Sequence, residues 1–212
     1  MKNIDIQKKY LKRAKIVAYL LQLAPFVRMV GLNGSLTRWQ ARESSDIDFL
    51  IIAKRNRIWT CRIFVTLITH LTGLRRYGDK TAGRICLNRY QTDNFLDIQP
   101  HNDYHARTFS QTWPLVNVNK TYEKFIQKNV WMAKMGYSFK KNEKNLQKNV
   151  IFASIRKMKE WILNGSFGDA VEKTLGNYQK KRILSDIRTR KAPKGRVRVS
   201  DRELCFHPLK EV

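Results

Sequence analysis

The chain has 212 residues, of which 42% are hydrophobic, and its lysine and arginine excess gives a formal net charge of +25. This length and apolar content are enough for a real core in one domain of ordinary size, with or without a small appendage. The charge creates a field that attracts polyanions, so nucleic acid, nucleoside triphosphates and anionic surfaces are the admissible partners, beside a merely solubilising basic surface.

Composition also argues against several classes of protein. The first fifteen or so residues are basic and contain no unbroken apolar run, so we expect no secretory signal peptide. The longest apolar segment, residues 58–74, contains Arg62 and His70 and is short for a membrane span, which favours a buried helix. The cysteines are odd in number and widely spaced, which favours a reducing cytoplasm over a disulfide framework or a cysteine metal site: Cys61, Cys86 and Cys205.

The first half of the chain alternates helical and strand patterns. Apolar residues recur at spacings of three or four over residues 6–24, which predicts a helix that Pro25 ends. Alternating or continuous apolar runs then predict three strands, and the apolar 58–74 segment predicts a second helix that Gly73 ends. The predicted strands are residues 26–32, 46–53 and 84–90, with a loop or short helix over 36–44.

The second half reads as mostly helical, with predicted helices over residues 101–112, 120–135, 145–163 and 169–188. The order predicts an α/β (α+β) fold, in which a small mixed sheet is followed by a helical C-terminal region. We therefore expect an α/β domain over residues 1–107, a helical region over 108–190 and a basic tail over 191–212.

The tail is strongly basic, as blocks that bind anions or remain solvated often are. A basic arm that contacts nucleic acid and a solvated surface segment are both open interpretations. Residues 197–200 can pair as a short edge strand, and Leu204 and Phe206 can dock the tail on the core.

A pair of carboxylates carries most of the chemical information. Asp46 and Asp48 are two residues apart in an apolar strand, so their side chains project from the same face. Neighbouring carboxylates repel each other unless a positive charge lies between them, and Mg²⁺ takes carboxylate and phosphate oxygens. Upstream, the Gly34-Ser35 pair can form a turn whose backbone N–H groups and hydroxyl meet a phosphate.

Gly-Ser, a spacer and Asp-x-Asp on a strand resemble the signature of the nucleotidyltransferase superfamily. The resemblance implies transfer of a nucleoside monophosphate from a triphosphate to an acceptor hydroxyl, with Mg²⁺ as cofactor. It implies that Asp46 and Asp48 are catalytic metal ligands and that three residues contact the nucleotide: Gly34, Ser35 and Ser45.

The wider chain is similar to a bacterial group of nucleotidyltransferase-domain proteins of poorly defined role. The stretches that carry this similarity include residues 45–52, 56–59, 62–67, 74–76, 85–90, 113–115, 122–131, 199–201 and 206–208. They identify the group and do not indicate which acceptor is modified.

Active members of the superfamily usually carry a third carboxylate on a neighbouring strand. Here that strand offers Asn88, which can coordinate a metal through its carbonyl oxygen but is no base. Asp97 is the candidate third catalytic carboxylate, although it can equally open the following helix as a cap.

Three functional hypotheses follow. The first is a metal-dependent nucleotidyltransferase that uses Asp46, Asp48 and Asp97. The alternative is a catalytically impaired nucleotide- or nucleic-acid-binding protein of the same fold, in which Asn88 marks the lost carboxylate. The third is a basic RNA-associated protein in which the aspartates are only structural.

Overall fold

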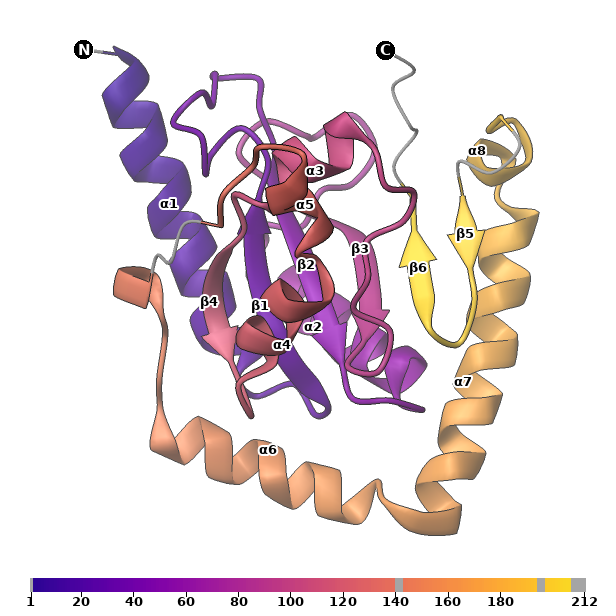
Figure 1. The fold of residues 1–212 in the computed structure, drawn as a ribbon. Coiled ribbons are helices and arrows are strands. Elements are labelled where there is room, and N and C mark those ends of the chain that lie inside the picture. Colours follow the sequence, from indigo (N-terminus) through magenta and orange to yellow (C-terminus); the bar gives the residue numbers. More distant parts are fainter. Residues whose placement is uncertain (1, 140–142, 194–196, 207–212) are drawn as a thin grey trace.

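The computed structural model describes residues 2–139, 143–193 and 197–206. These residues build a six-stranded sheet in the order β4-β1-β2-β3-β6-β5, with helices on both faces (Figure 1). The parallel pair β2–β3 lies among antiparallel pairs, so the predicted mixed sheet is confirmed. The strands are β1 (Val27–Asn33), β2 (Ile47–Ala53), β3 (Ile85–Thr92), β4 (Trp113–Asn117), β5 (Arg198–Val199) and β6 (Glu203–Cys205).

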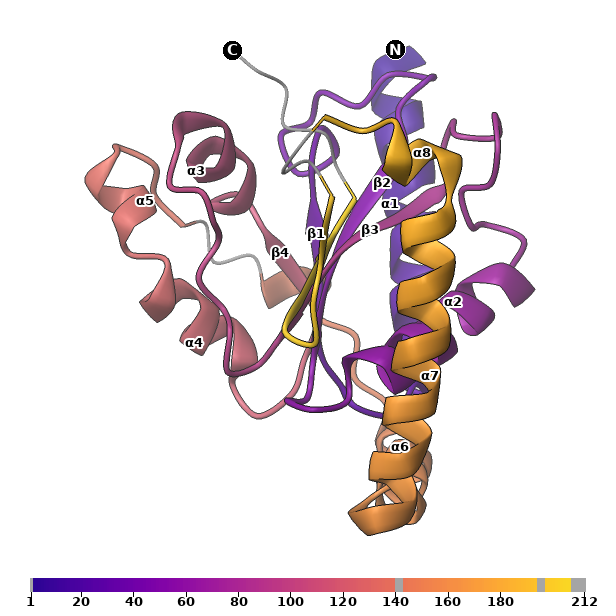
Figure 2. The same cartoon turned by 90° about the vertical axis from the view of Figure 1, so that its right-hand side faces the viewer.

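The helices divide between the two faces. Figure 2, in which the sheet is seen close to edge-on, shows α3, α4 and α5 on one side and α1, α2 and α7 on the other. None of the helices in the described residues has both the length and the apolar character needed to cross a bilayer. The bounds are α1 (Lys2–Leu21), α2 (Ile58–Leu71), α3 (Asp103–Phe109), α4 (Thr121–Lys128), α5 (Trp131–Lys134), α6 (Val150–Ile162), α7 (Gly165–Ser185) and α8 (Ile187–Arg190), with a 3₁₀ turn at Glu143–Asn145.

Each face of the sheet buries its own apolar cluster, as strand alternation requires. In β2, Ile47, Phe49 and Ile51 pack into the cluster beneath α1 and α2. Leu50 and Ile52 pack into the second cluster, beneath α3, α4 and α5. Asp48 is in phase with this second set, so its carboxylate faces the α3 side of the sheet.

Two predicted helices need correction, and one strand was not predicted. The helix predicted over residues 101–112 is the shorter α3, and residues 113–117 form a strand that was not predicted. Pro114 argued against a strand, but β4 is an edge strand, where a missing N–H costs little. The helix predicted over 120–135 is split into α4 and α5, because the buried Asn129 side chain between them bonds to the backbone of Leu96 and Ile98.

The C-terminal segment completes the sheet. The edge strand predicted over residues 197–200 is confirmed as β5, which pairs with the unpredicted strand β6, and β6 pairs with β3. Leu204 is fully buried and Phe206 packs against the larger core, so the predicted docking is confirmed. The sheet thus takes strands from all three predicted segments, although residues 194–196 and 207–212 of the basic tail lie outside the described residues.

Helix α7 is attached to α2 by one carboxylate. Glu172 accepts hydrogen bonds of 2.8 Å from the backbone N–H groups of both Trp59 and Thr60. These residues lie in the first turn of α2, and the side chain of the N-cap residue Arg57 accepts no capping hydrogen bond from that turn. Glu172 therefore satisfies donors that the helix itself cannot, next to the positive end of its dipole.

We expect Glu172→Ala to lower the free energy of unfolding by about 1–3 kcal/mol, the usual cost of leaving such donors unsatisfied. Chemical denaturation with circular dichroism measures the effect. Lys173→Ala, at an exposed position of the same helix, is the matched control and is expected to change stability by less than about 0.5 kcal/mol. Equal stability of the two variants would contradict a capping role.

Candidate active site

The candidate site lies at the end of the sheet where β1 finishes and where β2 and β3 begin. Asp48, at the start of β2, stands opposite Asn33 of β1 and opposite Cys86 of β3. Asp46 directly precedes β2 and belongs to the same alternating set. Adjacent strands therefore bring residues from three separate parts of the sequence to one point.

Two carboxylates and a thiol meet there. Ligand atoms of Asp46, Asp48 and Cys86 lie within 4.8 Å of one another, and within the described residues this is the group that can hold a metal ion. Asn88 Nδ2 donates to Asp48 Oδ1 at 2.9 Å and to Cys86 Sγ at 3.3 Å. The amide therefore supports both side chains by donation, instead of presenting its oxygen to them.

Arg76 brings positive charge to the same point. Its Nη1 lies 2.7 Å from Asp46 Oδ2 and 3.5 Å from Cys86 Sγ. The side chains of Arg76 and Asp46 are 42% and 23% exposed, so this ion pair lies at the mouth of the site. The guanidinium offsets part of the repulsion between the two carboxylates.

Burial and the neighbouring Asp46 carboxylate raise the pKa of Asp48 from 3.8 to about 7. The Asn88 hydrogen bond and the Arg76 and Arg38 charges act in the opposite direction without cancelling this shift. Burial, followed by the Asp48 and Asp46 charges, raises the pKa of the Cys86 thiol to about 12. An aspartate whose pKa lies near neutrality at a sheet end is a functional-site signature.

Two further groups act on Asp48 from the α3 side. The Tyr104 hydroxyl has its pKa raised by burial and next by the charge of Asp48. Arg38, from the loop between β1 and β2, interacts electrostatically with Asp48 and with Arg107 of α3. The site is therefore rimmed by cationic side chains, as a site for a polyanionic ligand requires.

Gly34 fits this site as no other residue would. Its φ of +79° lies in the left-handed region, which L side chains rarely adopt. A Cβ atom at this position would overlap Asp48 Oδ2 and lie 3.3 Å from Asp48 Cγ. The turn after β1 therefore packs directly on the Asp48 carboxylate.

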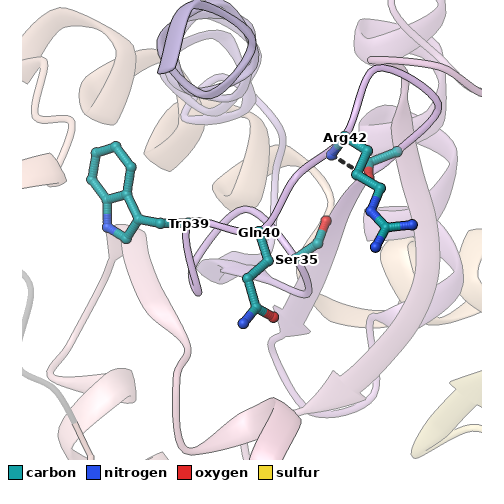
Figure 3. A pocket seen from close by; sticks show the side chains of 5 residues that line it. Ser35, Trp39, Gln40 and Arg42 are labelled. Atoms are coloured by element: carbon teal, nitrogen blue, oxygen red, sulfur yellow. Dashed lines mark hydrogen bonds between the residues drawn. The ribbon is translucent and has the colours of Figure 1, made fainter. Parts of the chain in front are cut away.

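The loop after Gly34 encloses a pocket. Figure 3 shows Trp39 on one side and Arg42 on the other, with Gln40 and Ser35 between them. The pocket has a volume of about 620 Å³, and its lining also includes Ser45, whose hydroxyl accepts a hydrogen bond from the backbone N–H of Arg42. Two predicted nucleotide-binding residues, Ser35 and Ser45, thus share one pocket wall.

The arrangement provides two carboxylates and a thiol that can hold a cation, and the loop between β1 and β2 lines a pocket with Arg42 in its wall. No family model, no curated protein and no solved structure matches the chain in the comparisons.

Asp97 occupies different surroundings from those of the paired aspartates. Its carboxylate forms an ion pair with His101 at 2.9 Å and a hydrogen bond with Gln99. Among the described residues, the metal-ligating group around Asp46 and Asp48 contains Cys86 and does not include Asp97. The structure thus places a thiol, with Asn88 behind it, where a third carboxylate was expected.

Sequence reasoning missed Cys86 and Arg76. Cys86 lies two residues before Asn88 in the same strand and so shares its face, but only the pairing of β2 with β3 places it opposite Asp48. Arg76 follows α2 in a segment with an isolated bridge between Arg75 and Ile85, and no local pattern shows that this bridge aims Arg76 at Asp46.

Proposed function

We propose that this protein is a metal-dependent nucleotidyltransferase that moves a nucleoside monophosphate from a nucleoside triphosphate to an acceptor hydroxyl. The observation that carries the proposal is the packing of the Gly34 turn against Asp48, beside Asp46. This contact joins a glycine turn at the end of β1 to a pair of carboxylates that can hold a metal, which is the combination that phosphoryl transfer needs.

The two carboxylates fit Mg²⁺, which prefers oxygen ligands and is usually held by one or two carboxylates together with substrate phosphates. Asp46 and Asp48 would hold it, and when bound it would neutralise charge that develops on the transferred phosphoryl group. The thiol of Cys86 is a poor match for this ion, since thiolates suit softer metals.

The remaining residues bind and orient the substrate. Ser35 lies in the same turn as Gly34 and lines the pocket, so its hydroxyl can donate to a phosphate oxygen. Arg38 and Arg76 stand beside the carboxylates and supply fixed positive charge next to the triphosphate.

The test is incubation of the protein with each labelled nucleoside triphosphate, Mg²⁺ and cell extract. We expect label on an acceptor fraction, and we expect Asp46→Asn to reduce its rate by at least about 100-fold, since the variant loses metal-binding charge. Asp97→Asn is the matched control and is expected to retain transfer, because Asp97 pairs with His101. Absence of label in every fraction, or label transfer that persists in Asp46→Asn, would contradict the proposal.

A second candidate function is binding of a nucleotide or nucleic acid without transfer. The observation that favours it is the ion pair between Arg76 and Asp46, which already supplies a cation to the carboxylates. Nucleotide binding without transfer would select this candidate. RNA binding that weakens steeply with salt would identify nucleic acid as the ligand.

A further inference from the structure

The side chain that completes the ligand group is a thiol, and this changes which metal the site prefers. Cys86 is 7% exposed and faces Asp48 across the β2–β3 ladder. Mg²⁺ binds oxygen ligands, whereas zinc accepts carboxylate oxygen and thiolate sulfur in one site. Catalytic zinc sites characteristically have three protein ligands and one open position.

The hydrogen bonds around Cys86 present its sulfur as an electron donor. Asn88 Nδ2 lies 3.3 Å from Sγ and Arg76 Nη1 lies 3.5 Å from it, and both atoms carry only protons to donate. A sulfur that receives two N–H donors is arranged as an acceptor, like a thiolate ligand held by its outer partners.

The same outer partners hold the oxygen ligands. Asn88 Nδ2 also donates to Asp48 Oδ1, so one amide orients the sulfur and one carboxylate together. Arg76 does the same for the sulfur and Asp46. Each ligand therefore has a partner that fixes it, which is the supporting arrangement that metal sites show.

We propose that Asp46, Asp48 and Cys86 form a three-ligand site for a divalent cation of the zinc class, with a fourth position open to a substrate oxygen. Binding forms a metal–sulfur bond and transfers the thiol proton to solvent, with no change of oxidation state. Arg76 and Arg38 offset the negative charge that two carboxylates and a thiolate leave around one divalent ion. The inference rests on the metal site of the proposed function and is independent of whether transfer occurs.

Cobalt(II) tests the proposal, because it occupies zinc sites and shows a thiolate-to-metal charge-transfer band in the near ultraviolet when sulfur is a ligand. The 212-residue chain, freed of metal with a chelator, is titrated with Co²⁺ and then with Zn²⁺. We expect the band to appear at one equivalent, to disappear when Zn²⁺ is added, and to persist in excess Mg²⁺.

Cys86→Ser is expected to lose the band and to weaken Zn²⁺ binding by at least about 10–100-fold, the range that loss of a single outer partner already costs. Cys205→Ser is the matched control, since this buried thiol also accepts from an arginine, at 3.4 Å, and is expected to retain the band. Cys86→Asp is expected to bind Mn²⁺ or Mg²⁺ in place of Zn²⁺. Circular dichroism verifies that each variant is folded.

A band that survives in Cys86→Ser, or Co²⁺ binding to the wild-type chain without a thiolate band, would overturn the proposal. The absence of stoichiometric Co²⁺ binding to the folded protein would overturn it as well. Nucleotide transfer without a cobalt–thiolate band would leave the proposed function standing and reject only the thiol ligand. A cobalt–thiolate band without nucleotide transfer would support the thiol ligand and reject the proposed function.

Discussion

Asp48→Asn is expected to abolish nucleotide transfer and, at the same time, to stabilise the fold above pH 7. The stabilisation follows from burial and the Asp46 charge, which raise the pKa of Asp48 from 3.8 to about 7, and the loss of transfer follows from the loss of a metal-ligating carboxylate. The site holds an aspartate where its charged form is unfavourable, and aspartates of this kind cluster at functional sites.

The direction of the pH dependence follows from proton linkage. Between pH 4 and pH 7 the folded protein retains a proton on Asp48 that the unfolded chain has lost, so stability falls as pH rises through this range. Below that range both states are protonated and the contribution vanishes. Because one pKa unit corresponds to about 1.4 kcal/mol, we expect Asp48→Asn to gain about 2–4 kcal/mol at pH 8 and almost nothing at pH 4.

Denaturant unfolding of wild type and variant at several pH values measures this difference, and the labelled-nucleotide assay measures activity. The control is Asp79→Asn, an exposed residue that is expected to change stability by less than about 0.5 kcal/mol. A variant that is no more stable than wild type at pH 8 would contradict the raised pKa. Retained transfer would remove Asp48 from the catalytic group.

The central strands were predictable because their signals are local. Alternation across residues 46–53 identified β2 and placed Asp46 and Asp48 on one face, and the Gly-Ser turn placed Gly34 near them. The strands β4 and β6 were not predictable in this way. β4 contains Pro114 and β6 spans only three residues, so both are strands because β1 and β3 offer them backbone partners.

Cys86, the third ligand, could not be predicted from the sequence for a different reason. A search for a carboxylate led to Asn88 and Asp97, whereas the register pairs Asp48 with Cys86 and a β-bulge follows before Leu50 meets Arg89. Register and bulge arise from pairing between distant segments, and a shift of one residue reverses every side chain. The residue that faces Asp48 could therefore not be read from either strand alone.

Gly34→Ala is expected to destabilise the protein by about 2–4 kcal/mol and to reduce transfer by about 100-fold, since small displacements of reacting groups cost that much. Two separate effects lower the stability of this variant. The φ of +79° strains any L side chain, and the new Cβ would overlap Asp48 Oδ2. The carboxylate would have to move away from Asp46 and Cys86, which disperses the ligand group.

Gly73→Ala separates the cost of backbone strain from the cost of steric overlap with Asp48. Gly73 has a φ of +67° and nothing within 4 Å of its would-be Cβ, so its substitution introduces the backbone strain alone, about 1 kcal/mol. Denaturant unfolding of both variants then isolates the steric contribution at Gly34 as the difference between them. Equal losses would show that the turn does not press on Asp48.

A double-mutant cycle with Asp48→Ala identifies the colliding atoms. Asp48→Ala removes the carboxylate that the alanine Cβ would meet, so Gly34→Ala introduced into that background should cost only what Gly73→Ala costs. If the cost of Gly34→Ala is unchanged in that background, the strain comes from the turn itself. The close fit between turn and carboxylate, which carries the proposed function, would then have no energetic basis.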